Sequence, residues 1–198
     1  MMLPIHFANC TDFFSEVVIE CKNRAAGIFY HPYYSDYGWI WVDSKYKSDF
    51  RQHILVHEIG HALGIGSLWG FIPNVIEYNI ENNLYLYKYE NSKAINEYKR
   101  YFGDHLEFIP LENNGIPGQI HVHPEEGEEI GVSSNNIYIN GVLYPGLDKE
   151  LMTGWLDDED SHTFIPSLSR ITLGFLEDIG FDVNYDNADE YIASQQNI

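Results

Sequence analysis

The sequence is poor in cysteine and has no long apolar run, and both shortages exclude classes of protein. Only two cysteines, Cys10 and Cys21, occur among 198 residues. Two thiols cannot frame a disulfide-rich secreted scaffold and fit no zinc-binding cysteine motif, and we expect them to be free rather than bridged. No segment approaches the roughly 18–20 apolar residues of a membrane span. Met1–His6 also lacks the basic region and apolar core of a standard secretory signal.

Basic residues are the second shortage. Eleven lysines and arginines stand against 30 acidic residues, and the formal net charge is −19 at pH 7. A surface of this sign repels phosphate, so we expect no nucleic-acid partner and no binding to anionic lipid through a basic patch. The acidic run Asp157–Asp160 lacks the spacing and the glycine of an EF-hand loop. We interpret it as a solvated loop rather than a calcium site.

The remaining composition and its patterning are those of a globular α+β domain. Hydrophobic residues make up 44% and charged residues 21% of the chain, which is typical of a folded domain of this length. Strands are predicted at Leu3–Ala8, Ile28–Tyr34 and Trp39–Asp43, and we expect the last two to form a hairpin. A second hairpin is predicted at Asn136–Tyr144 around Asn140-Gly141. The segment Val75–Tyr89 has a mixed pattern, from which we predict no single element.

Helices are recognised by apolar residues at helical spacing between capping residues. They are predicted over Asp12–Ala25, from a Ser48 cap to Leu63 before Gly64, over Ser92–Phe102 before Gly103, and over Arg170–Ile179 after Ser167 or Ser169.

The most informative segment is His57-Glu58-Ile59-Gly60-His61, which matches H-E-x-x-H on a predicted helix. Helical residues four apart lie about 40° from each other around the axis, so both imidazoles project from one face and can share a cation. Glu58 flanks that cation, where a base for a metal-bound water must stand. Leu55, Ile59 and Ala62 form the opposite face, which we expect to pack on the sheet.

This five-residue pattern also arises by chance on amphipathic helices whose histidines face solvent. Gly64 extends the match to H-E-x-x-H-x-x-G, the start of the metzincin zinc-peptidase motif, and a glycine there permits a sharp turn. In the contiguous motif a third histidine stands at position 67, where this chain has Ser67. The third ligand is therefore missing or comes from further along the chain.

Several segments together resemble the leishmanolysin-like branch of the metzincins, in which a long insertion precedes the third zinc histidine. The resemblance covers roughly residues 39–190 and is weakest in the first forty residues and at 124–147. The segments that carry it are His57–Trp69, Asn113–Gly115 with Gly118, Lys149–Trp155, Pro166–Leu173, Leu176–Phe181 and Asp182–Asp189.

The resemblance implies a metzincin-like zincin fold over residues 1–198 as a single metallopeptidase domain. A small mixed β-sheet would pack on the H-E-x-x-H helix in an upper subdomain, residues 1–66. A loop-rich C-terminal subdomain, residues 67–198, would hold the insertion, the third ligand, the Met-turn and a final helix.

The same resemblance assigns candidate ligands for one catalytic Zn²⁺. His57 and His61 transfer directly, and for the third ligand the spacing from Gly118 favours His123 over His121. In an extended segment these two histidines would point the same way. His105 and His162 are more distant candidates, and a surface position is the ordinary interpretation of each.

Met152 resembles the methionine of the Met-turn, which in the family lies beneath the zinc histidines as an apolar floor and is not a ligand. A core methionine is the alternative interpretation. Trp155 follows the turn and would form part of the cleft wall, and residues 134–147 are interpreted as an insertion that serves specificity or docking.

These assignments predict a zinc-dependent endopeptidase. A zinc-activated water would attack the peptide carbonyl while Glu58 acts as general base and returns the proton to the leaving amine. The predicted partner is a peptide or protein substrate, and assembly with a larger particle or surface complex is a further expectation. The alternative is a virion- or surface-associated binding or structural protein that keeps a zinc site on this fold.

Overall fold

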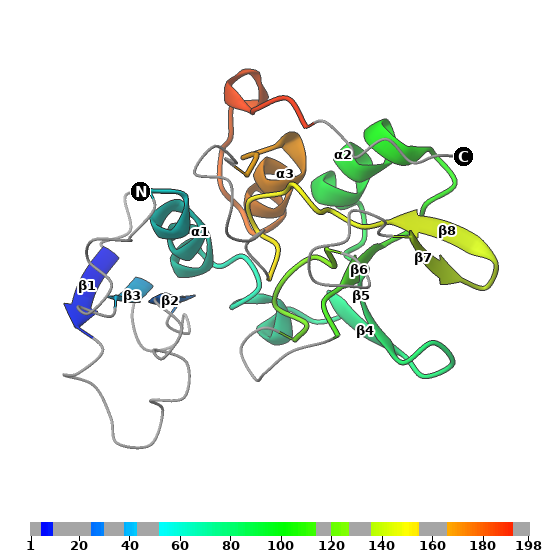
Figure 1. The fold of residues 1–198 in the computed structure, drawn as a ribbon, viewed down its shortest axis with the longest axis horizontal. Helices are drawn as coiled ribbons and strands as arrows, with labels where there is room; N and C mark the ends of the chain where they lie inside the picture. Colours follow the sequence, from blue (N-terminus) through cyan, green and yellow to red (C-terminus); the bar gives the residue numbers. More distant parts are fainter. Residues whose placement is uncertain are drawn as a thin grey trace, which may run out of the picture. The chain divides into compact units, whose positions relative to one another are not determined.

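The computed structural model describes residues 5–9, 25–29, 38–42, 52–113, 120–126, 136–154 and 166–191 (Figure 1). Within these ranges it contains three α-helices and eight short strands in three small sheets. The α+β class predicted from the sequence is therefore confirmed. The chain divides into two compact units, Met1–Trp69 and Gly70–Ile198, and each is described by itself.

The first unit contains a small mixed sheet and the H-E-x-x-H helix. Strand β3 (Gly38–Val42) lies between β1 (Ile5–Asn9), which is parallel to it, and β2 (Ala25–Phe29), which is antiparallel. Helix α1 (Gln52–Leu63) contacts β2 and β3. A mixed sheet against this helix is the arrangement expected for the first unit.

Two details of the first unit differ from expectation. The second strand begins at Ala25 rather than Ile28, so the last residue of the helix predicted over 12–25 is in a strand. The rest of that predicted helix lies outside the described residues, as does Ser48, the predicted cap of the helix that ends at Leu63. On α1, Ala62 is buried, but Leu55 and Ile59 are only half-buried and Ile54 is buried in their place. The buried face of α1 is thus rotated from the one that apolar residues alone predict, and it includes Glu58 and His61.

The second unit contains an antiparallel sheet that the sequence pattern did not reveal. Its strands are β4 (Ile76–Asn79), β5 (Leu84–Tyr87) and β6 (Ile109–Leu111), in that order. The Asn79 carboxamide oxygen accepts the backbone N–H groups of Glu81 and Asn82, both at 3.1 Å, and Asn83 has a φ of 54°. Asparagines suit such a turn because their side chains mimic backbone acceptors and tolerate left-handed backbone. This turn chemistry was the available signal in the segment 75–89.

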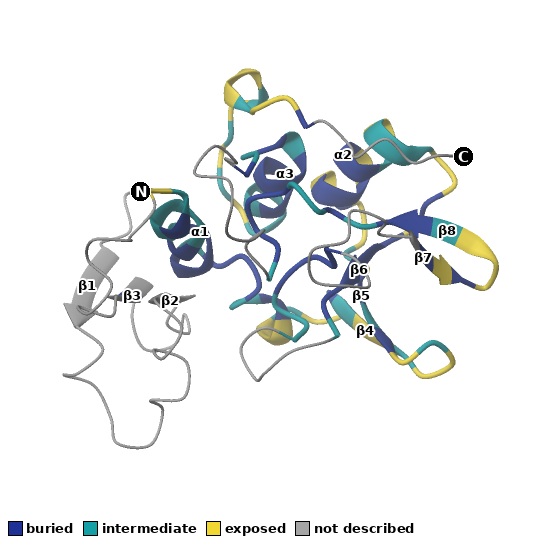
Figure 2. Ribbon diagram, in the orientation of Figure 1, coloured by how far each residue is buried: buried dark blue, intermediate teal, exposed yellow. Residues whose placement is uncertain are grey.

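Helices α2 (Lys93–Phe102) and α3 (Arg170–Asp178) pack closely against each other in the second unit. Gly103 ends α2 as predicted, and Ser92 is its N-cap rather than its first residue. Of the two caps proposed for the last helix, Ser169 is the one that the structure has. A Cβ added to Gly174 would lie 2.5 Å from the Cα of Ala94, so only glycine permits this approach. Figure 2 shows the buried residues gathered on these two helices and on β5 and β6.

The hairpin predicted around Asn140-Gly141 is confirmed. It consists of β7 (Asn136–Ile139) and β8 (Val142–Pro145), and both turn residues have positive φ, 52° and 79°, as a type I′ turn requires. Tyr144 stacks on Phe108 at a centroid distance of 4.1 Å, which fastens the hairpin to the unit's core.

Two short 3-10 turns, η4 (Trp69–Phe71) and η5 (Tyr185–Asn187), complete the described elements. No helix among the described residues has the length and apolar character needed to cross a membrane.

Candidate metal centre

The C-terminal end of α1 is closed by a Schellman motif at Gly64. The N–H of Ile65 donates to the carbonyl of Gly60 at 3.1 Å, and the N–H of Gly64 donates to that of His61 at 3.0 Å, the two bonds that define this motif. Gly64 has a φ of 123°, which favours glycine. The stop predicted at Gly64 is confirmed, and the motif reverses the chain beside the second histidine.

That reversal fixes the orientation of His61. Its Nδ1 lies 2.9 Å from the carbonyl oxygen of Ile65, and only a protonated Nδ1 can donate this bond. The lone pair of a neutral ring is then on Nε2. Ser67, which stands where the contiguous motif has a histidine, donates its hydroxyl to the His61 carbonyl at 2.7 Å. The serine thus secures a ligand candidate instead of supplying one.

The two histidines of α1 face each other through their Nε2 atoms. These atoms are 3.0 Å apart, with the rings nearly perpendicular at 81°. Two nitrogens at tetrahedral positions about 2.0–2.1 Å from a zinc ion are separated by about 3.3 Å. The pair on α1 therefore has nearly the separation that one shared ion requires.

His123 is held in the second unit by pairing with β6. Glu112, which follows β6, donates its backbone N–H to the His123 carbonyl at 3.0 Å, and Glu125 donates to the carbonyl of Pro110 at 2.9 Å. Pro124 forms an antiparallel bridge with Leu111. Pairing on both sides of it fixes the backbone of His123, whose side chain is buried.

His121 has a different environment, and one expectation about it is wrong. Its φ of 53° breaks the extended conformation from which a common direction for the two side chains was expected. Its ring packs on Tyr85 at a centroid distance of 4.7 Å, and burial lowers its pKa. Because His121 has left-handed backbone, its side chain and that of His123 have different surroundings although the two residues are only two positions apart.

The proposed Met-turn is a buried turn beside His123. Thr153 donates its N–H and its hydroxyl to the carbonyl of Glu150, at 3.4 Å and 3.0 Å, and Met152 is completely buried. A Cβ added to Gly154 would lie 3.5 Å from Cγ and Nδ1 of the His123 ring. The turn therefore packs against the third histidine.

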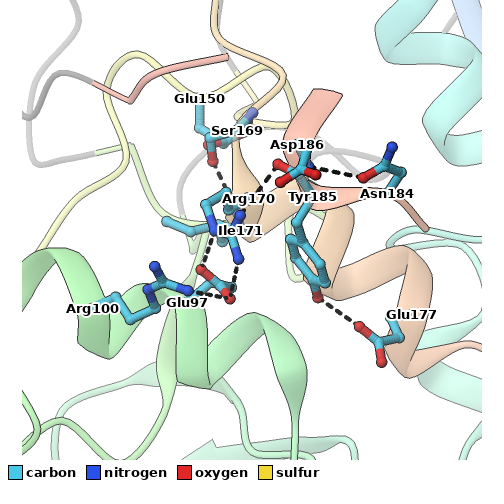
Figure 3. Close-up of polar contacts among 10 residues, drawn as sticks. All are labelled: Glu97, Arg100, Glu150, Ser169, Arg170, Ile171, Glu177, Asn184, Tyr185 and Asp186. Atoms are coloured by element: carbon cyan, nitrogen blue, oxygen red, sulfur yellow. Dashed lines mark hydrogen bonds and ion pairs between the residues drawn. The ribbon is translucent and has the colours of Figure 1, made fainter. Parts of the chain in front are cut away.

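Glu150 anchors this turn to the start of α3, a role that sequence reasoning missed. Its fully buried carboxylate accepts the hydroxyl of Ser169, the N-cap of α3, as Figure 3 shows. It also accepts the Thr172 hydroxyl at 2.5 Å and the N–H groups of Ser169 and Leu151, both at 3.3 Å. Burial raises the pKa of Glu150 to about 7, although these donors oppose the rise. Glu150 precedes Ser169 by 19 residues, so no local sequence pattern indicated this role.

One group of three histidines among the described residues could hold a metal ion: His57, His61 and His123. Their ligand nitrogens all lie within 4.8 Å of one another. His105 is in the turn after α2, beside Gly103, and does not belong to the group. His162, Trp155, Gly118 and the segment 157–160 lie outside the described residues.

Comparisons with protein-family models, with curated proteins and with solved structures found no match to this chain.

Proposed function

We propose that this protein is a zinc-dependent endopeptidase of the leishmanolysin-like kind. The observation that carries the proposal is the group of three histidine nitrogens within 4.8 Å of one another. Two of them come from an H-E-x-x-H helix that also supplies Glu58. This combination of three imidazoles and an adjacent carboxylate is the donor set of a hydrolytic zinc site.

The residues present fit a zinc ion on chemical grounds. Imidazole nitrogen is a preferred zinc ligand, and three neutral imidazoles leave the charge of the ion uncompensated. The orientation of His61 supports this fit, because its Nδ1 faces a backbone carbonyl and its Nε2 faces His57. Such outer hydrogen bonds are a regular feature of metal-binding histidines.

Each residue has a distinct role in the proposed reaction. His57, His61 and His123 would hold the ion, which when bound polarises the peptide carbonyl and lowers the pKa of water. Glu58 would accept a proton from the attacking water and return it to the leaving amine. Glu58 follows His57 on α1 and is buried, which supports this assignment. Met152 would supply an apolar surface without contributing a ligand.

The direct test measures bound metal per purified chain, together with cleavage of an unfolded protein with and without a chelator. One zinc per chain and chelator-sensitive cleavage are expected. Zinc without cleavage, also in the presence of many different peptides, would favour the alternative of a binding or structural protein that retains a zinc site. A chain that takes up no metal would contradict both.

A further inference from the structure

A hydrogen bond from the second ring nitrogen orients His61. A metal-binding histidine usually donates its second ring N–H to a carboxylate, a backbone carbonyl or water, which fixes the tautomer and the direction of the ligand nitrogen. For His61 that acceptor is the carbonyl of Ile65. For His123, the second unit offers the buried Glu112, whose Cγ lies near the ring.

Glu112 has the position for this role. Its Cγ lies 3.6 Å from the point that a Cβ of Gly154 would occupy, and Nδ1 of His123 lies 3.5 Å from the same point. The carboxylate extends about 2.5 Å beyond Cγ along two standard bonds. Cγ of Glu112 and Nδ1 of His123 are thus neighbours of the same point, and a carboxylate directed toward the imidazole would approach Nδ1.

The backbone fixes the two residues against each other. Glu112 donates its N–H to the carbonyl of His123 at 3.0 Å and accepts the N–H of His121 at 2.7 Å. The glutamate thus pairs with the segment on both sides of position 122. Its distance from His123 cannot change without breaking this pairing.

The side chain of Glu112 is buried. Glu112 is 1% exposed, and an ionised carboxylate at such a site requires hydrogen bonds or an opposite charge. An imidazole N–H supplies the first, and a cation bound to the far side of the same ring supplies the second. One hydrogen bond from Nδ1 of His123 to the Glu112 carboxylate would supply an acceptor for the imidazole and a donor for the carboxylate.

We propose that Glu112 is a positioning residue for His123, accepting the proton of Nδ1 so that Nε2 is presented to the metal. This inference rests on the proposed function, because it assumes that His123 is a zinc ligand. It assigns to Glu112 an effect on metal affinity and on the geometry of the site, transmitted through His123.

The test uses the full chain and compares Glu112→Gln and Glu112→Ala with the wild type in zinc competition titrations and in the visible absorption of the Co²⁺ form. Loss of an outer partner typically costs about 10–100-fold in metal affinity. We expect Glu112→Ala near the upper end and a shifted cobalt band. Glu112→Gln should retain more affinity, because its amide oxygen still accepts the Nδ1 proton.

Glu97→Gln is the matched control. Glu97 is also a buried glutamate, but its carboxylate pairs with Arg170 at 2.7 Å. This variant should melt at a lower temperature and bind zinc as the wild type does. In the His123→Ala background, Glu112→Ala should cause no further loss of zinc affinity, because the residue it positions is gone.

Wild-type zinc affinity and an unchanged cobalt spectrum in Glu112→Ala would overturn the inference, as would an equal loss with and without His123. If Glu112→Ala does not fold, Glu112→Gln decides through its effect on zinc affinity and on the cobalt spectrum with and without His123: an effect that is the same in both backgrounds would overturn the inference. Failure of the proposed function is seen separately, in a wild-type chain that takes up no zinc.

Discussion

The two sources of the histidine group are built in different ways. His57 and His61 are four residues apart on one helix, and the Schellman motif at Gly64 supplies the hydrogen bond that orients His61. His123 depends on pairing with β6 and on packing against Gly154, residues distant in sequence. A ligand pair on a helix is determined locally, whereas the third ligand is determined by the fold of its unit. Substitutions should therefore act differently in the two regions.

The largest expected effect is on the rate of cleavage, and it concerns α1. Glu58→Ala should lower the rate of peptide cleavage by at least about a hundredfold, the lower end of the range for a lost general base. Zinc stoichiometry should stay at the wild-type value, because the ligands on α1 are untouched. Cleavage assays and metal analysis on the same preparation check both parts, and activity close to wild type would remove Glu58 from its assigned role.

The next largest effect is on zinc affinity, and it distinguishes His123 from the nearby His121. His123→Ala should weaken zinc binding by more than the roughly 10–100-fold expected for loss of an outer partner. His121→Ala should leave the zinc affinity nearly unchanged, since that ring packs on Tyr85. Competition titrations measure both, with each variant serving as the control for the other. The opposite order would assign the ligand to His121.

What could be predicted from the sequence follows the same division. Local signals were sufficient for α1 with its stop at Gly64, for α2 between Ser92 and Gly103, and for the hairpin at Asn140-Gly141. In each case the capping or turn residue acts within a few positions of itself.

Long-range pairing was harder to anticipate. The three-residue strand β6 has no periodicity that could identify it, and it exists because β5 and the segment at 124 pair with its two edges. The left-handed φ of His121 likewise has no signature in a histidine. The role of Glu150 depends on α3, whose N-terminus is 19 residues further along the chain.

Glu150 offers a third way to sharpen the comparison, through pH. Its folded-state pKa of about 7 exceeds the ordinary 4.5, so the folded chain binds this proton more tightly than the unfolded chain does. The stabilisation is complete below about pH 4.5 and is lost as the pH rises through 7. Its slope cannot exceed about 1.4 kcal/mol per pH unit for one group.

Glu150→Gln should remove this dependence, because an amide does not titrate. Denaturant unfolding between pH 4.5 and 7 should show a flatter profile for the variant than for the wild type. Parallel profiles for wild type and Glu150→Gln would contradict the raised pKa.

The smallest effect is expected at Met152, the residue between the anchor Glu150 and the contact at Gly154. Met152→Leu conserves side-chain volume, and such a swap in a buried position usually costs less than about 1.5 kcal/mol. If the methionine is an apolar floor, zinc affinity and cleavage should change little, because leucine supplies a similar surface. Loss of zinc with an unchanged unfolding midpoint would instead mean that the sulfur acts on the metal directly. Residues outside α1 would then contribute two ligand atoms instead of one, so the fold of the second unit would determine as many ligands as the helix does.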